Sequence, residues 1–125
     1  VDSGCGCSMA IRMRVIDELG WFDPTYFLYN EDNELCYRYS KAGYKIKLAS
    51  KSIVHHYFWG STDVISSAKI FYGVRNRLWF IKKYFGRKRF LYFWLRALGR
   101  TLDYAQKFDK IHFTNYLKAL IHATR

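Results

Sequence analysis

Three carboxylates in the segment 30–34 form the part of the chain best suited to acid–base chemistry. Glu31, Asp32 and Glu34 follow Asn30 and an aromatic run at 26–29. Asparagine is a favoured N-cap and acidic residues favour the first helical turn, so the pattern predicts a helix start. A carboxylate held there stays ionised at neutral pH and can accept a proton from a sugar hydroxyl. On local physics alone, a capped and charged first turn without catalytic function is the stronger interpretation.

Two adjacent histidines, His55 and His56, are the candidate metal ligands. In an extended segment, neighbouring side chains point to opposite faces, so at most one of the two faces a given site. A histidine on a strand is more often structural than a ligand. A neutral imidazole beside carboxylates is nonetheless a standard ligand for divalent metals.

The N-terminal segment Gly4-Cys5-Gly6-Cys7 contains two glycines but no established phosphate-loop pattern. It is a weak candidate for a phosphate loop and a plausible small-residue turn lining a pocket. With Cys36 the chain has three cysteines, an odd number that fits neither a disulfide framework nor a four-ligand zinc set. We expect buried or partly buried free thiols in a reducing cytoplasm.

The elements that position these residues are expected to be mixed. Alternation and apolar runs predict strands at 8–11, 44–49 and 53–57. Helical patterns occupy 14–19, ended by Gly20, and the segment from Asn30 to Gly43, where Glu34 and Arg38 are spaced to pair. After residue 61 the sequence pattern changes to one typical of amphipathic helices. Three helices are expected at 64–85, 88–107 and 110–123, with a break at 86–88.

Composition and charge divide the chain into two halves. The 125 residues amount to one domain at most, and half of them are apolar. Residues 1–63 have a net charge of −1, whereas residues 64–125 have +12. No stretch approaches the roughly 20 apolar residues of a membrane-spanning helix. We therefore expect the second half to meet an anionic partner, and we expect the chain to be cut from a longer protein.

A basic run at 82–89 precedes an apolar, aromatic run at 90–95. The first holds five Lys or Arg residues, and the second reads Phe-Leu-Tyr-Phe-Trp-Leu. Nucleic acid, an anionic membrane surface and solvated helix ends are all compatible with the charges. The adjoining aromatic run favours a membrane interface or a protein neighbour over nucleic acid.

The order and spacing of several motifs resemble one enzyme family. These motifs are Gly20-x-Phe22-Asp23, Phe27-x-Tyr29-x-Glu31-Asp32, Arg38, Gly43-Tyr44 and His56-x4-Ser61. Together they resemble the C-terminal half of a family 2 glycosyltransferase of the GT-A fold, closest in character to rhamnosyltransferases and galactofuranosyltransferases. The resemblance covers residues 1–62, and the segment 72–77 resembles the Tyr-rich Arg-Asn helix that follows the family's catalytic core.

The resemblance implies an α/β fold. Residues 1–63 would form the C-terminal, acceptor-binding portion of a GT-A (nucleotide-diphospho-sugar transferase) domain, and residues 64–125 a basic, aromatic-rich helical extension. The donor-binding half with its Asp-x-Asp motif is absent from this chain, so the fragment alone is expected to be inactive. Unpaired strand edges would favour association, including homo-oligomers.

The family's site residues carry over by position. Asp32 matches the general base that deprotonates the acceptor hydroxyl, and Glu31 would orient the acceptor. His56, rather than His55, matches the histidine at the donor diphosphate and its divalent metal, Mg²⁺ or Mn²⁺, because Ser61 follows at the family's spacing. The donor and acceptor pocket would include residues of the N-terminal loop and two others, namely Gly4, Cys5, Gly6, Trp21 and Arg38.

The implied function is inverting transfer of a sugar from a nucleotide-diphosphate sugar donor to a hydroxyl of a glycan or lipid-linked acceptor, in synthesis of cell-wall or cell-surface polysaccharide. The protein would be cytoplasmic and peripheral on the inner face of the cell membrane, docked by residues 82–95, with no specific nucleic acid partner. The rival interpretation is a non-enzymatic basic module that binds nucleic acid or membrane. A regulatory remnant that keeps a transferase fold without activity is a third.

Overall fold

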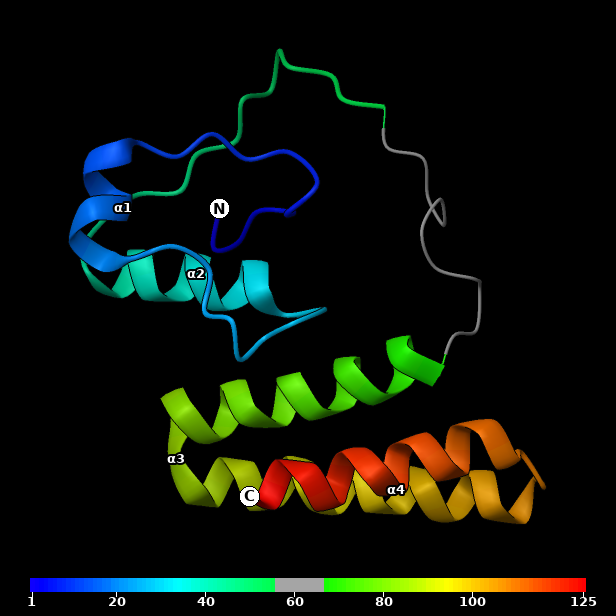
Figure 1. Ribbon diagram of the computed structural model, residues 1–125. Helices are drawn as coiled ribbons and strands as arrows, with labels where there is room; N and C mark the ends of the chain where they lie inside the picture. The colour runs from blue at the N-terminus through cyan, green and yellow to red at the C-terminus, as the bar shows by residue number, and fades with distance from the viewer. Residues whose placement is uncertain (56–66) are drawn as a thin grey trace. The chain divides into compact units, whose positions relative to one another are not determined.

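The computed structural model describes residues 1–55 and 67–125. The described residues form four helices, α1 (Met13–Leu19), α2 (Glu31–Lys41), α3 (Ser67–Gln106) and α4 (Lys110–Thr124). The chain divides into two compact units, Val1–Gly60 with α1 and α2, and Ser61–Arg125 with α3 and α4 (Figure 1). Each unit has its own hydrophobic core, and each is described separately below.

The predicted α/β fold, a portion of a GT-A domain, is wrong, because the described residues contain helices and irregular segments but no β-strand. The expected strands at 8–11 and 44–49 are irregular, as are residues 53–55 of the third. A strand persists only where a second strand completes its hydrogen-bond ladder. Here the apolar side chains of Met9 and Ile11 instead pack on the helical core of the first unit.

The first unit is built around Val15 of α1 and Leu35 and Tyr39 of α2, all buried. Helix α2 ends as predicted near Gly43, whose φ of 91° lies in the left-handed region that suits glycine. The Gly43 N–H donates to Ser40 O at 3.0 Å, and the Tyr44 N–H donates to Tyr39 O at 3.1 Å. This pair of bonds is a Schellman motif, and Tyr44 completes it by packing on the same core.

The second unit contains three helical rods, as the sequence predicts. Helix α3 is interrupted at Gly86, whose φ of 79° and ψ of 177° are not helical. The chain turns back there, so the two parts of α3 run antiparallel, and α4 lies beside the second part (Figure 1). Glycine is the residue that tolerates this backbone conformation, because residues with a side chain rarely adopt so positive a φ.

The core of the second unit joins all three rods. Leu78 lies before the break, and Leu120 and Ala123 belong to α4; all three are buried.

Asp109 caps α4 by accepting a hydrogen bond from the His112 N–H at 3.1 Å. Across the ranges 1–55 and 67–125, no helix is both long and apolar enough to cross a membrane.

Candidate active site

The predicted catalytic carboxylates lie at the start of α2, after two residues in left-handed conformation. Tyr29 has a φ of 66° and Asn30 a φ of 68°. Asn30 precedes the first helical residue as predicted, but its side chain makes no capping bond. A capping residue is normally extended, and the left-handed backbone of Asn30 does not meet that requirement. Two consecutive non-glycine residues in this region store backbone strain, which proteins concentrate at functional sites.

The N-terminal loop lies against the first turns of α2. The Gly6 N–H donates to Asp32 Oδ2 at 3.1 Å, and the Gly4 N–H donates to Cys36 Sγ at 3.3 Å. Ser3 Oγ donates to Asn33 Oδ1 at 2.8 Å. The structure therefore brings Gly6 against Asp32 and Gly4 against Cys36, whereas the sequence placed Gly4, Cys5 and Gly6 near the catalytic carboxylates only through the resemblance.

A side chain at Gly4 would press on the end of the Met9 side chain. A Cβ built there would lie 3.2 Å from the Met9 methyl carbon Cε, and one built at Gly6 would lie 3.5 Å from Asp32 Cβ. The contact at Gly4 is tighter than ordinary van der Waals packing, whereas that at Gly6 is ordinary. A residue with a side chain at Gly4 would therefore require a small shift of Met9.

One carboxylate oxygen of Glu31 is shielded from solvent and accepts no hydrogen bond from the described residues. Its Oε2 is buried and has no hydrogen-bond partner within the described part of the chain. Burial raises the pKa of the Glu31 carboxyl, and the nearby charge of Asp32 also raises it, against an opposing hydrogen bond from its own backbone. A buried, unpaired acceptor costs stability, so such a group calls for an explanation beyond folding.

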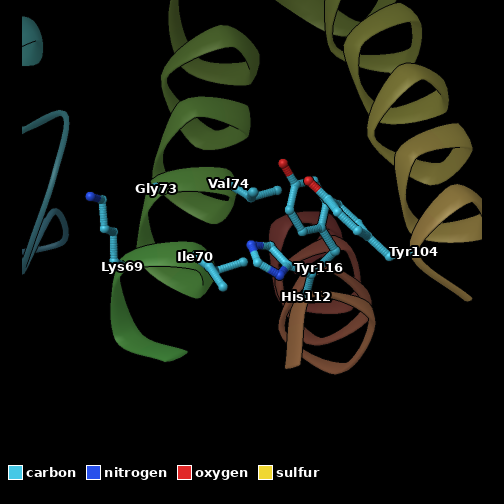
Figure 2. A pocket seen from close by; sticks show the side chains of 7 residues that line it. All are labelled: Lys69, Ile70, Gly73, Val74, Tyr104, His112 and Tyr116. Carbon is cyan, nitrogen blue, oxygen red and sulfur yellow. The ribbon is translucent and has the colours of Figure 1, made fainter. Parts of the chain in front are cut away.

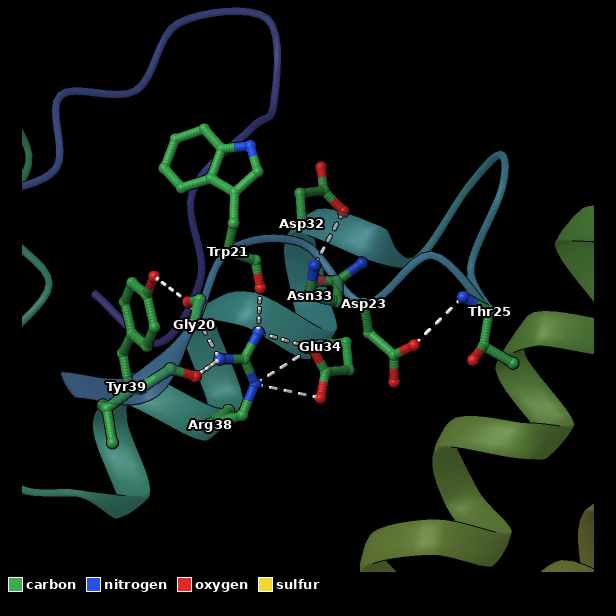
Figure 3. A network of polar contacts seen from close by, with 10 residues as sticks. Gly20, Trp21, Asp23, Thr25, Asp32, Asn33, Glu34, Arg38 and Tyr39 are labelled. Carbon is green, nitrogen blue, oxygen red and sulfur yellow. Dashed lines mark hydrogen bonds and ion pairs between the residues drawn. The ribbon is translucent and has the colours of Figure 1, made fainter. Parts of the chain in front are cut away.

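Arg38 is used within the protein rather than displayed to a ligand. Its guanidinium donates to the carbonyl oxygens of Leu19, of Gly20 at 3.2 Å and of Trp21 at 2.6 Å (Figure 3). It also pairs with Glu34, whose side chain is fully buried, at 3.2 Å. The predicted Glu34–Arg38 pair is thus confirmed, and it fastens the 19–21 segment to α2. Membership of Arg38 in a substrate pocket stays a prediction.

Trp21 is positioned by that contact. Its backbone carbonyl accepts from Arg38, while its indole is half exposed and packs edge-on against Phe22 with ring centroids 5.0 Å apart. In Figure 3 the indole and the Asp32 carboxylate both project to the side away from Glu34. An exposed indole on the same side as a carboxylate is a suitable stacking face for a sugar ring.

The predicted metal ligand His56 and its spacing partner Ser61 lie outside the described residues. Elsewhere, in 1–55 and 67–125, no group of three or more His, Cys, Asp or Glu side chains is arranged to hold a metal ion. The described residues therefore do not by themselves fit the Mg²⁺ or Mn²⁺ that the resemblance implies, and the metal stays a prediction.

The three cysteines are free, as predicted, but they differ in exposure. Cys36 is buried, whereas Cys5 and Cys7 are exposed, which the expectation of buried thiols did not anticipate. A hydrogen bond of the Cys7 thiol to Cys5 raises the pKa of Cys7. The 5–8 turn, in which the Ser8 N–H donates to Cys5 O at 3.3 Å, holds both thiols on the surface.

Half of the aromatic run at 90–95 packs on the core of the second unit. Phe90, Phe93 and Trp94 pack on the Leu78 cluster, and Trp94 Nε1 donates to Leu120 O at 3.3 Å. The remaining apolar residues of the run are more than half exposed, namely Leu91, Tyr92 and Leu95. The rings are thus largely explained by folding of the second unit, and the membrane hypothesis depends on a smaller exposed set.

Two contacts of the first site, made by three residues, were not predicted from the sequence. Ser3 and Asn33 join the N-terminal loop to α2, and Tyr39 donates from its hydroxyl to Gly20 O at 2.8 Å. The spacing of Tyr39 on the apolar face of α2 predicted burial but not this bond, and no local signal joins residue 3 to residue 33.

Comparison of the chain with protein-family models, with characterised proteins and with solved structures finds no match.

Proposed function

We propose that the first unit carries the acceptor-activating carboxylates of an inverting glycosyltransferase. The reaction moves a sugar from a nucleotide-diphosphate sugar to a hydroxyl of a glycan or lipid-linked acceptor, in synthesis of cell-surface polysaccharide. The ordered motifs between Gly20 and Gly43 support the assignment, since their joint spacing resembles family 2 enzymes. The observation that carries it is the Glu31–Asp32 pair, with its buried and unpartnered Oε2 atom.

Asp32 is the proposed base. Its Oδ2 accepts from the Gly6 N–H at 3.1 Å and its Oδ1 from the Asn33 N–H at 2.7 Å, so the carboxylate is held in one orientation. It takes the proton of the acceptor hydroxyl while that oxygen attacks the anomeric carbon and the nucleoside diphosphate leaves. The attack comes from the face opposite the leaving group, so configuration inverts.

Glu31 is the proposed acceptor-orienting group. Its Oε2 lacks a partner among the described residues, so a hydroxyl of the acceptor can donate to it without displacing a protein bond. Binding of a hydroxyl here would offset the cost of burying the oxygen.

The test is Asp32→Asn in the intact protein that contains this chain. Release of nucleoside diphosphate is measured with a panel of nucleotide-diphosphate sugars and a lipid-linked acceptor. We expect turnover to fall by about 10²–10⁴-fold, the usual effect of losing a general base. Asp17→Asn, at an exposed position of α1, is the control and should leave turnover unchanged. Retention of most activity by Asp32→Asn, or failure of the unsubstituted protein to use any donor, would overturn the proposal.

A second function, docking on an anionic membrane through residues 82–95, is favoured by a specific observation. Leu91, Tyr92 and Leu95 are each more than half exposed, and Arg87 and Lys88 are exposed immediately before them. Apolar side chains next to cations suit the interface between lipid headgroups and acyl chains. The rival of nucleic acid binding rests on net charge alone.

A further inference from the structure

The second unit contains a cavity that the proposed transferase chemistry does not use. It has a volume of about 280 Å³ and lies between α3 and α4 (Figure 2). Among the described residues, its lining comes from the start of α3, the end of α3 and the first turns of α4, namely Lys69, Ile70, Gly73, Val74, Tyr104, His112 and Tyr116. The volume is close to the lower limit of small-molecule sites.

An oriented imidazole forms the polar part of the cavity. His112 Nδ1 lies 2.8 Å from Asp109 Oδ2, and the same aspartate accepts from the His112 backbone N–H at 3.1 Å. A carboxylate partner holds the proton on Nδ1, so Nε2 of the neutral ring is a hydrogen-bond acceptor. In Figure 2 the ring's second nitrogen is directed toward Ile70 on α3. A ligand in the cavity therefore meets an acceptor of fixed direction.

Aromatic rings form one wall. The Tyr104 ring stacks on His112 with centroids 4.7 Å apart and an interplanar angle of 22°, and it lies 5.3 Å from the Tyr116 ring. Burial raises the pKa of the Tyr104 hydroxyl, with a further contribution from Tyr116, so that hydroxyl stays neutral at physiological pH. Ring faces on one side and aliphatic side chains on the other suit a flat apolar body.

Gly73 keeps the opposite wall open. It lies in the helical part of α3, and a Cβ built on it meets nothing within 4 Å. Gly99, also in α3, likewise meets nothing within 4 Å, but it does not line the cavity. The backbone at Gly73 thus has room for a larger side chain at the edge of the cavity.

The described lining places no charged group toward the aromatic side of the cavity, which disfavours an ionic ligand there. Lys69 is the one charged residue among the described lining residues, and Figure 2 shows its ammonium group directed away from the Tyr104, Tyr116 and His112 rings. The polar atoms on the aromatic side of the cavity are the tyrosine hydroxyls and the imidazole nitrogens. These groups form hydrogen bonds with a neutral ligand.

We propose that this cavity binds a small neutral phenol, whose hydroxyl donates a hydrogen bond to His112 Nε2 and whose ring packs between Tyr116 and the Ile70 and Val74 side chains. A phenol combines a flat aromatic body with one donor of suitable direction. Its hydroxyl is protonated at neutral pH, as that of tyrosine is. The site is independent of the glycosyl-transfer proposal, since none of its residues belongs to the first unit.

The experiment titrates p-cresol into the 125-residue chain and follows backbone and imidazole NMR signals, with toluene as the probe lacking a hydroxyl. We expect saturable shifts around His112 and Tyr104 with a dissociation constant of about 1 mM for p-cresol. Toluene should bind at least tenfold more weakly. Equal binding of the two probes, or no saturable shift with p-cresol, contradicts the proposal.

Two variants test the location. Gly73→Leu adds a bulky side chain to the cavity lining and should weaken p-cresol binding at least tenfold, while Gly99→Leu makes the same change elsewhere on α3 and should not. His112→Phe keeps a ring to stack on Tyr104 but removes the acceptor, so its p-cresol affinity should fall to that of toluene. Circular dichroism verifies that each variant keeps its helices. Unchanged binding in Gly73→Leu, or equal loss in both glycine variants with helices retained, overturns the assignment.

Discussion

Glu31 links folding to pH at the scale of a single residue. Its carboxyl has a raised pKa because it is buried, so the folded state holds the proton more tightly than the unfolded chain does. The contribution of Glu31 to stability is therefore fully present below the ordinary value of 4.5 and is lost as the pH rises through the window between that value and the folded-state pKa. The isosteric change Glu31→Gln should remove this pH dependence and leave the protein at least as stable at pH 7.

Urea unfolding from pH 4 to pH 8, followed by circular dichroism, measures the effect. Asp17→Asn, an exposed carboxyl on α1, is the matched control and should keep the pH dependence of the unsubstituted protein. A clear loss of stability for Glu31→Gln at pH 7 would show that Oε2 has a stabilising partner. A variant that is more stable but less active fits a group kept for function at a cost in folding.

Arg38 is the residue that ties the 19–21 segment to α2. Arg38→Met removes the ion-pair partner of the fully buried Glu34 carboxylate and the guanidinium that donates to three backbone carbonyls. Removing one partner of a buried ion pair costs about 3 kcal/mol in free energy of unfolding. Lys41→Met, on the exposed side of the same helix, should change it by less than about 0.5 kcal/mol. Similar midpoints for the two variants in a denaturant titration would contradict the assigned role.

At the scale of the element, the break in α3 decides the shape of the second unit. Gly86 adopts a φ of 79° and a ψ of 177°, a region that only glycine populates freely. Gly86→Ala should destabilise the unit by about 1–3 kcal/mol. Gly99→Ala, in the helical part of α3, should instead stabilise it by about 0.5–1 kcal/mol. Thermal unfolding of the pair gives the sign directly, and equal shifts would mean that α3 is a continuous helix in solution.

Helix α3 also shows why the sequence pattern alone overestimates how much apolar surface is exposed. The run 90–95 looks too apolar for a solvated helix, yet Phe90, Phe93 and Trp94 are consumed by packing within the unit. Side chains three and four residues apart share one helix face, so these three face the core together while Leu91 and Leu95 share another face. The apolar side chains of the run that remain exposed are few, and their function depends on the surface or molecule that contacts them.

At the scale of the whole molecule, the charge asymmetry predicts reversible binding to anionic membranes through residues 82–95. Each Lys or Arg near such a surface contributes about 1 kcal/mol, so Arg87, Lys88 and Arg89 changed together to Gln should weaken vesicle binding about 100-fold. Co-sedimentation with phosphatidylserine-containing vesicles at low and high salt measures it. Binding should fall with salt and be absent on neutral vesicles.

A matched variant keeps the test specific. Lys107, Lys110 and Lys118 lie outside residues 82–95, and their joint change to Gln removes the same charge. It should weaken vesicle binding much less. Equal losses in both triple variants would indicate net charge rather than a surface, and no binding to either vesicle type would remove membrane docking altogether.

Local sequence signals by themselves determined most helix positions and their ends. Gly20, Gly43 and Gly86 each stand where a helix ends or breaks, because the backbone there needs a positive φ. The spacing of Glu34 and Arg38 foretold their pair, since residues four apart meet on a helix. These features depend on contacts within about four residues, which a sequence displays directly.

Only the tertiary structure decided the rest. The alternation at 44–49 predicted a strand, but a strand is a property of two segments, and the described residues supply no ladder partner for it. The loop–helix bonds of Gly4 with Cys36 and of Gly6 with Asp32, the buried Oε2 of Glu31 and the cavity beside His112 likewise join or depend on residues far apart in the chain. Such contacts follow from how elements pack, which no local pattern encodes.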